Sequence, residues 1–458
     1  MELENLKKSI KKTENDKRTD ADEDAMEWNL NNNTLYSHLD IPHQFPFNNR
    51  AGYEYILPAY TKDKSGRYLI FQDGINIRAY DPSQTMEDMS AKGLLWHHST
   101  SDKNFKPDKL KSSCKAPLLG AAIDGDIVYS NMYDGEKFED TSDSSKGFVQ
   151  INSIKAFKYK DKNGLPVWTS KLKKHWFFTD KKFWISAPIN ATKDKIIAGA
   201  VIQNGSIRES VVFALNKKTG DLDWITHINT LKMDTLAGYH IALSPVLASV
   251  ENGSVYVSTN DGMSACIDEE TGEHVWISSL FRFEDKFKPS FHPPNPPVIK
   301  NQNVFFLPMN NPEFYYCNIH TGVVSKVADP LHSKHDKKVL WNVAQYIIAS
   351  NEDNMMVSFS EGLITLYSDW PDINGKVLSL AGSFETYKGA PVFCGEFLVM
   401  LGVGRNFKCG LNIYNKTTWK LTAHIGHEEE KFSGNLLVAG EFLIVAGNKK
   451  ITIYGPER

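Results

Sequence analysis

Two segments combine closely spaced aromatic and basic residues, the side chains that commonly bind other proteins. Residues 169–187 read TSKLKKHWFFTDKKFWISA, and residues 277–296 read ISSLFRFEDKFKPSFHPPNP. Aromatic and Arg side chains supply much of the binding energy at protein interfaces, whereas lysines attract an acidic surface. We therefore expect a site for an acidic protein partner that comprises Lys173, Lys174, Trp176, Phe177, Lys181, Lys182, Trp184, Phe281, Arg282, Phe283 and Phe287. The competing interpretation is that individual aromatics of these segments cover the core.

Other residue patterns give weaker indications of chemistry. The pairs His332/His335 and His424/His427 have a spacing that suits a metal, but neither has a Cys or carboxylate partner nearby in the sequence. We expect them to be solvated loop residues. The five cysteines are scattered and odd in number, which favours reduced core thiols over disulfides. No phosphate-binding glycine loop, serine nucleophile elbow or zinc-protease motif is present.

A repeat indicates which elements must position these segments. Residues 214–224 read ALNKKTGDLDW and residues 266–276 read CIDEETGEHVW, so a strand, a Thr-Gly turn and a Trp recur. A period of about 50 residues with turn glycines and one fixed aromatic is typical of a β-propeller. Shorter matches end at Trp96 and Trp168, whereas degenerate units have Lys326, Ser379 and Ala423 in the place of the Trp.

A second marker gives the number of units. A proline precedes an apolar strand in six units, and Val343 and Asn435 take its place in two others; the prolines are Pro58, Pro117, Pro188, Pro245, Pro297 and Pro391. Each is followed by a strand rich in apolar and β-branched residues, such as GSVYVST at residues 253–259. We predict an all-β fold, an eight-bladed propeller of four-stranded antiparallel blades.

The last unit lacks a strand, because the sequence ends soon after ITIY at residues 451–454. Near the N-terminus, MEWNL at residues 26–30 supplies an unassigned Trp28. We predict that this segment closes the ring as the missing strand, since closure removes two exposed sheet edges.

These residues resemble the pyrroloquinoline-quinone-type (PQQ-type) repeat family, whose consensus is Ala, any residue, Asp, two more, Thr-Gly, three more, Trp. The resemblance covers roughly residues 28–454 and is strongest in the third and fourth units. It implies that the motif tryptophans dock between adjacent blades; these are Trp28, Trp96, Trp168, Trp224 and Trp276.

The same resemblance leaves two classes of function open. Some members are quinone-dependent alcohol or sugar dehydrogenases with a calcium ion and a catalytic Asp, and the alcohol-oxidising ones usually have an adjacent Cys-Cys pair. No two cysteines are adjacent here, and no calcium cluster can be assigned residue by residue. We therefore expect no cofactor and a non-enzymatic, protein-binding scaffold like that of the bacterial outer-membrane assembly lipoprotein. An assembly role or toxin neutralisation as an immunity protein would suit such a scaffold. The alternative is a PQQ-dependent oxidoreductase.

Composition agrees with one large β domain over residues 26–458 of the 458-residue chain. The net charge of −3 argues against nucleic acid as the main partner, and no apolar run approaches the roughly 18 residues that cross a bilayer. Residues 1–25 are highly charged, so we expect a disordered tail and, because no apolar signal segment is seen, residence in a bacterial cytoplasm. The oligomeric state stays open.

Overall fold

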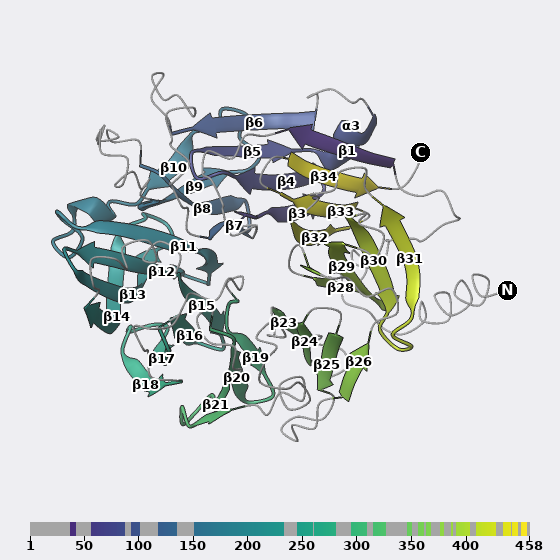
Figure 1. The fold of residues 1–458 in the computed structure, drawn as a ribbon. Helices are drawn as coiled ribbons and strands as arrows, with labels where there is room; N and C mark the ends of the chain where they lie inside the picture. Colours follow the sequence, from purple (N-terminus) through teal and green to yellow (C-terminus); the bar gives the residue numbers. More distant parts are fainter. Residues whose placement is uncertain are drawn as a thin grey trace.

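The structure of the chain is a computed structural model. It describes residues 37–42, 56–87, 93–100, 118–134, 151–232, 245–259, 261–280, 295–308, 315–326, 346–349, 356–360, 363–367, 376–379, 386–387, 391–403, 409–426, 434–440, 442–447 and 450–455. The described strands form eight sheets arranged around a common centre (Figure 1), and all strand pairs but one are antiparallel. The predicted all-β architecture of antiparallel, mostly four-stranded sheets is confirmed. The tail predicted for residues 1–25 lies outside the described residues.

The first four sheets follow one another along the chain. Sheet 1 contains β3 (Ala59–Asp63), β4 (Gly66–Gln72), β5 (Asn76–Tyr80) and β6 (Leu94–Ser99), with helix α3 (Pro82–Glu87) before β6. Sheet 2 contains β7 (Leu119–Asp124), β8 (Ile127–Met132), β9 (Ser153–Lys158) and β10 (Pro166–Thr169), and β2 (Ile56–Leu57) pairs with β7. Sheet 3 contains β11 (Lys182–Ala191), β12 (Lys195–Asn204), β13 (Ile207–Asn216) and β14 (Leu222–Lys232). Sheet 4 contains β15 (Val246–Glu251), β16 (Ser254–Thr259), β17 (Met263–Asp268) and β18 (His274–Ser279).

The remaining sheets have shorter strands and complete the arrangement. Sheet 5 contains β19 (Val298–Lys300), β20 (Asn303–Phe306), β21 (Tyr315–Asn318) and β22 (Val324–Lys326). Sheet 6 contains β23 (Tyr346–Ala349), β24 (Met356–Ser360), β25 (Leu363–Tyr367) and β26 (Lys376–Ser379). In sheet 7, β27 (Thr386–Tyr387) and β28 (Val392–Cys394) both pair with β29 (Phe397–Val403), followed by β30 (Cys409–Asn415) and β31 (Leu421–Gly426). Sheet 8 contains β32 (Asn435–Ala439), β33 (Phe442–Ala446), β34 (Lys450–Gly455) and β1 (Ser37–Pro42).

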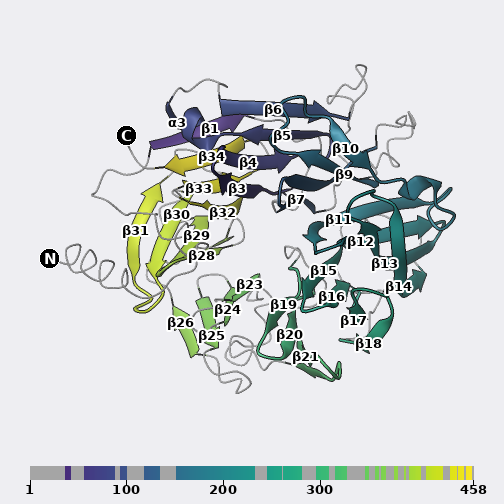
Figure 2. The same cartoon turned by 180° about the vertical axis from the view of Figure 1, so that it is seen from behind.

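Sheet 8 combines the first described strand of the chain with the last three. Strand β1 pairs antiparallel with β34 from Ser37 opposite Gly455 to Pro42 opposite Lys450. An N-terminal strand thus completes the last sheet, but it is residues 37–42 rather than the predicted residues 26–30. Trp28 lies outside the described residues. In the views from both sides, the first strand of a sheet lies near the centre and the last at the perimeter, where β1 takes the place of a fourth strand (Figure 2).

Tryptophans connect each of the first four sheets to the next one. The indole Nε1 donates to a main-chain carbonyl oxygen in the turn between the third and fourth strands of the following sheet. The pairs are Trp96 with Tyr159 (2.7 Å), Trp168 with Lys217 (3.1 Å), Trp224 with Glu269 (3.0 Å) and Trp276 with Ile319 (2.8 Å). The repeated Trp of the sequence is therefore an inter-sheet contact at four successive interfaces.

The turn glycine of the repeat makes room for this indole. A Cβ at Gly272 would lie 2.7 Å from the ring of Trp224, and Gly220 and Gly322 face Trp168 and Trp276 in the same way. Gly272 also has a φ of +76°, a left-handed conformation that costs a residue with a Cβ about 1–2 kcal/mol. The close approach of the indole therefore requires glycine, and the backbone conformation favours it.

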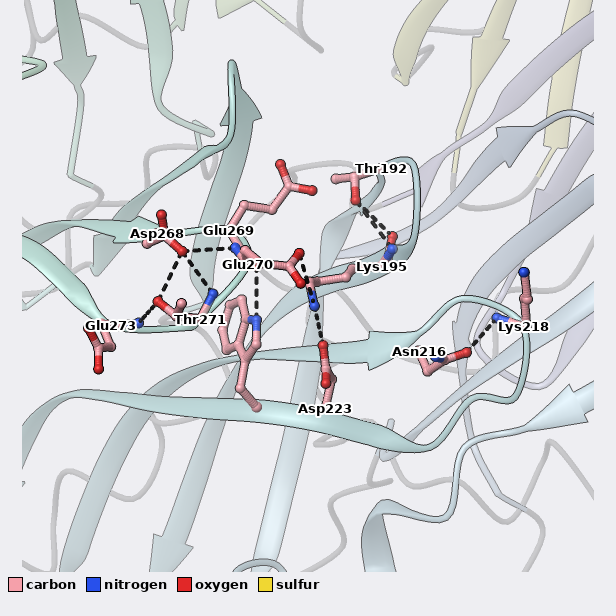
Figure 3. A network of polar contacts seen from close by, with 11 residues as sticks. Thr192, Lys195, Asn216, Lys218, Asp223, Asp268, Glu269, Glu270, Thr271 and Glu273 are labelled. Atoms are coloured by element: carbon pink, nitrogen blue, oxygen red, sulfur yellow. Dashed lines mark hydrogen bonds and ion pairs between the residues drawn. The ribbon is translucent and has the colours of Figure 1, made fainter.

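The turn itself is held by side chains (Figure 3). The carboxylate of Asp268 accepts hydrogen bonds from the main-chain N–H groups of Glu270 (3.0 Å) and Thr271 (2.8 Å), which fixes the backbone around the carbonyl that Trp224 uses. Lys195 of sheet 3 pairs with Asp223 of its own sheet and lies 3.5 Å from Glu270 of sheet 4. Ionic contacts thus reinforce the same interface.

A β-bulge directs the docking side chain. In sheets 1 to 4 the register between the third and fourth strands shifts next to the Trp, as between Cys266 and Ile267. Such an extra residue turns a side chain out of the regular alternation. Sheet 7 keeps the shift with Ala423 in place of the Trp. No shift is recorded in sheet 5, where Lys326 lies opposite Tyr315, or in sheet 6, where Ser379 lies opposite Leu363.

Nearer the centre, a buried amide joins the first three sheets. Asn131 in β8 donates to the carbonyl oxygens of Leu118 (3.0 Å) and Ile185 (2.9 Å) and accepts from the main-chain N–H of Gly120 (3.0 Å) and from the amide of Gln72 (3.0 Å). Fully satisfied buried polar groups fix one geometry, because any other arrangement leaves a buried donor or acceptor unpaired.

We expect Gly272→Ala to lower the free energy of unfolding by about 2–4 kcal/mol, because the new Cβ overlaps Trp224 and the left-handed backbone is strained. Gly253→Ala is the matched control, since Gly253 has a φ of +77° but a Cβ added there would meet no other residue's atoms within 4 Å, its two chain neighbours apart. It should cost about 1–2 kcal/mol, the strain alone. In a Trp224→Ala background, itself lower by about 3–5 kcal/mol, the two glycine variants should become equal. Equal penalties in the wild-type background, measured by urea unfolding, would contradict the docking contact.

A pair of truncations tests the role of β1. Removal of residues 1–25, the predicted tail, should leave the melting temperature nearly unchanged. Removal of residues 1–42 should lower it by roughly 10 °C, because the edge of β34 loses its partner. Thermal unfolding by circular dichroism measures both, and equal melting temperatures would show that β1 contributes nothing to stability.

Candidate functional site

Of the predicted binding segments, the structure describes the one between sheets 2 and 3. Residues 170–181, here called the Trp176 loop, connect β10 at the perimeter of sheet 2 with β11 near the centre of sheet 3. A 3-10 helix, η3 (Leu172–Lys174), begins the loop, and Leu172 inserts into the core between the two sheets. The segment predicted as residues 169–187 thus includes the first six residues of β11.

Local hydrogen bonds make the Trp176 loop compact. The carbonyl oxygen of His175 accepts from the main-chain N–H groups of Phe178 (2.9 Å) and Thr179 (3.0 Å) and from the Thr179 hydroxyl (2.9 Å). His175 Nδ1 accepts from the N–H of Phe177 (3.3 Å). Asp180 has a φ of +60°, a conformation that Asp adopts more readily than most residues, and it turns the chain back toward β11.

A ladder of aromatic rings runs from the core to the tip of this loop. Phe213 in β13 meets Phe178 with a centroid separation of 6.2 Å and an interplanar angle of 80°. Phe178 meets Phe177 at 5.4 Å and 78°, and Phe177 meets Trp176 at 5.6 Å and 80°. Edge-to-face contacts of this kind are favourable. Trp176 at the end of the ladder is 77% exposed, so a large apolar ring is supported from beneath and open to solvent.

The lysines of the segment divide into two groups. Three have carboxylate partners on the neighbouring sheets: Lys171 with Asp221 at 3.6 Å, Lys173 with Asp134 at 3.8 Å and Lys181 with Glu209 at 3.5 Å. Lys174 and Lys182 are exposed and form no ion pair within the part of the chain that the structure describes. Within the described residues, two of the five lysine charges are therefore not neutralised by an ion pair.

The other residues of the predicted site lie elsewhere. Trp184 is 2% exposed and packs in the core between sheets 3 and 4, so it is not available to a partner in this conformation. Neighbouring residues of a strand face opposite sides of the sheet, which explains why Phe183 packs toward sheet 2 instead. Phe281, Arg282, Phe283 and Phe287 lie outside the described residues.

Sheet 3 extends beyond its neighbour on the side of the Trp176 loop. Its strands have 10 or 11 residues, whereas those of sheet 4 have six. The extra residues lie where β12 turns into β13, since Trp224 pairs with Ala214 near the other end of β13. Glu209, the partner of Lys181, belongs to this extension. Glu209 was not predicted from the sequence, although the long apolar run IIAGAVI in β12 is a signal of the extension.

The described residues provide no metal centre. No group of three or more His, Cys, Asp or Glu side chains within them is arranged to hold a metal ion. His424 lies in β31 rather than in the expected loop, and its Nδ1 is 2.6 Å from Oδ1 of Asn412.

Burial raises the pKa of the Cys317 thiol to about 11 and that of the Cys394 thiol to about 12, which keeps both protonated and unreactive. Within the described residues, no helix has the length and apolar character to span a bilayer.

Comparisons with known proteins show the fold. No protein-family profile and no curated protein sequence matches the chain. The quinohemoprotein alcohol dehydrogenase from Comamonas testosteroni is similar with a TM-score of 0.56 and 11% identity, over 93% of this chain and 77% of that one. Sqt1 from Saccharomyces cerevisiae gives 0.51 and 10% over 93% and 100%, and BamB from Moraxella catarrhalis 0.50 and 12% over 92% and 99%. At such identities the likeness supports the β-propeller fold and says nothing of function.

One histidine between sheets 1 and 2 has a strongly lowered pKa. His98 lies in β6, with its ring 5.2 Å from that of Phe157 in β9. Burial lowers the pKa of His98 to about 4, with a further contribution from the nearby Lys155 ammonium. His98 stands two residues after the docking Trp96. The equivalent positions after Trp224 and Trp276 are Thr226 and Ser278, whose hydroxyls bond to carbonyl oxygens of the next sheet.

We expect His98 to make stability fall in mild acid. The folded state holds the His98 ring neutral, whereas the unfolded state takes up a proton below its pKa of about 6.5. The contribution of His98 to the free energy of unfolding is therefore complete above pH 6.5 and is lost as the pH falls from there toward 4. Between pH 7.5 and 5 the wild type should lose about 1 kcal/mol more unfolding free energy than His98→Ser, a value reduced for partial solvent exposure. Urea unfolding of both proteins at the two pH values measures this. An identical pH dependence would show that His98 is not buried in its neutral form.

Proposed function

We propose that this protein is a non-enzymatic β-propeller scaffold that binds another protein through the Trp176 loop. The observation that carries the proposal is the 77% exposure of Trp176 at the end of an aromatic ladder. A large apolar side chain that is held in water by a structured loop is typical of a binding residue, because nothing in its own fold benefits from its exposure. Loops on a rigid scaffold are also where binding residues concentrate.

The proposal includes the architecture around the loop. We take the eight sheets as one closed, eight-bladed ring that spans residues 26–458 and acts in the cytoplasm. Pairing of β1 with β34 and the tryptophan contacts between sheets 1 to 5 support a continuous ring. A rigid ring suits a scaffold, since it presents the Trp176 loop without a conformational change.

The proposed partner has an apolar pocket for Trp176 and an acidic surface beside it. Lys174 and Lys182 are the described cations of the segment that remain available for steering, because Lys171, Lys173 and Lys181 are paired within the chain. An assembly role or neutralisation of a toxin would both use such a contact.

The test requires a partner, identified by affinity purification from the native organism and mass spectrometry. Trp176→Ala should then speed dissociation roughly 30-fold, a loss of about 2 kcal/mol, while the double substitution Lys174→Glu and Lys182→Glu should mainly slow association and reduce its salt dependence. Val275→Ala, a 55% exposed residue on the outer strand of sheet 4, is the control and should change neither rate. Surface plasmon resonance at two ionic strengths measures both rates.

Two outcomes would overturn this proposal. Unchanged kinetics for the Trp176 and Lys174/Lys182 variants, in folded protein, would place the binding surface elsewhere. Retention of pyrroloquinoline quinone with calcium through gel filtration, together with dye-linked oxidation of alcohols or sugars, would favour the PQQ-dependent oxidoreductase instead.

A further inference from the structure

Lys181 lies where it can hold another side chain of its own chain in place rather than contact a partner. Its ammonium lies 4.5 Å from the centroid of the Phe177 ring and 3.5 Å from Glu209 Oε1. Phe177 in turn meets the ring of Trp176. We propose that Lys181 is a positioning residue that fixes the indole of Trp176 for its partner, an inference that rests on the proposed function of the Trp176 loop.

The contacts of Phe177 explain why this ring needs a further restraint. The Lys181–Glu209 pair over the ring is here called the clamp. Phe178 below it is 1% exposed and fixed by the core, whereas Phe177 is only half-buried and is the last ring before Trp176. A cation over an aromatic face adds an attraction that strengthens as water is excluded. Lys181 and Glu209 are 23% and 17% exposed, so the pair is partly shielded from solvent. The cation therefore holds Phe177 between the core and the indole.

The extension of sheet 3 provides the fixed end of the clamp. Glu209 lies in β13, which is paired on both sides with β12 and β14, so its backbone cannot shift independently of the sheet. Lys181 directly precedes β11 of the same sheet, and its N–H bonds to the carbonyl oxygen of Phe178 at 3.2 Å. Both charged groups are thus anchored, and the loop residue Phe177 is the part that they restrain.

This arrangement also describes the partner more closely. An indole that is already ordered loses little conformational entropy on binding, so it suits a preformed apolar pocket of another protein. The charge of Lys181 is neutralised by Glu209 and is not offered to the partner. Lys181 and Lys174 should therefore affect binding differently. Lys181 should keep the Trp176 side chain ordered, whereas Lys174 should attract the partner electrostatically.

Fluorine NMR of the full chain with 5-fluorotryptophan tests this without a partner. Trp176→Phe assigns the resonance. Lys181→Met keeps the aliphatic stem but removes the cation, and we expect it to narrow the Trp176 line at least twofold and to leave the other nine tryptophan resonances in place. Lys181→Arg should restore the wild-type line, because it retains the positive charge. Lys182→Met, the matched control at the exposed neighbouring lysine, should change nothing.

Two results would overturn the inference. One is a Trp176 line that is equally broad in the wild type and in Lys181→Met. The other is a wild-type line already as narrow as that of an unrestrained residue. The nine remaining resonances report whether each variant is folded, and Glu209→Gln provides a second route to release the clamp. Because no partner enters the experiment, failure of the positioning role is separable from failure of the proposed binding function.

Discussion

The contact between an indole and a glycine turn is the constraint on which the rest of the structure depends. Trp224 can donate to the Glu269 carbonyl only because Gly272 has no Cβ in the space that the ring occupies. The same geometry recurs at the interfaces that follow sheets 2 and 4. It sets the spacing of successive sheets, and with it the place at which each connecting loop crosses from the perimeter of one sheet to the centre of the next.

The interface between sheets 6 and 7 shows that the docking Trp and the turn glycine depend on each other. The turn at Asn415 keeps the hydrogen bonds of the glycine turns, including one from Trp419 N–H to the Asn415 carbonyl oxygen at 2.7 Å. Trp419 occupies the glycine position with a φ of +55°. The last strand of sheet 6, β26, contains no Trp. A side chain at the turn position excludes an indole from the preceding sheet, so a turn can accept a large residue only where the docking Trp has been lost.

The same interfaces connect the scaffold to the candidate site. The core between sheets 2 and 3 contains Leu172, Phe178 and Phe213, and the Trp176 loop is attached to it through the first two. Trp176 is therefore exposed on a loop that is attached to the core rather than on a loose one. The paired lysines show that the surrounding charge serves mainly to hold the loop, so recognition by this surface would rest on the aromatic tip and a small number of free cations.

The sequence by itself determined the repeating unit, because strand, turn glycine and docking Trp are local features with a fixed spacing. It also placed the aromatic and basic residues in a connection between sheets. The strand that completes sheet 8 was not accessible in this way, since residues 37–42 have no Trp and are selected by their register with β34 at the far end of the chain. The sequence likewise did not separate Trp176 from Trp184, because exposure depends on the sheet that each side chain faces. Nor did it identify the paired lysines, whose carboxylate partners Asp134, Glu209 and Asp221 come from other strands and turns. Only the packing of sheets 2 and 3 brings those charges together, and that packing leaves Trp176 in solvent.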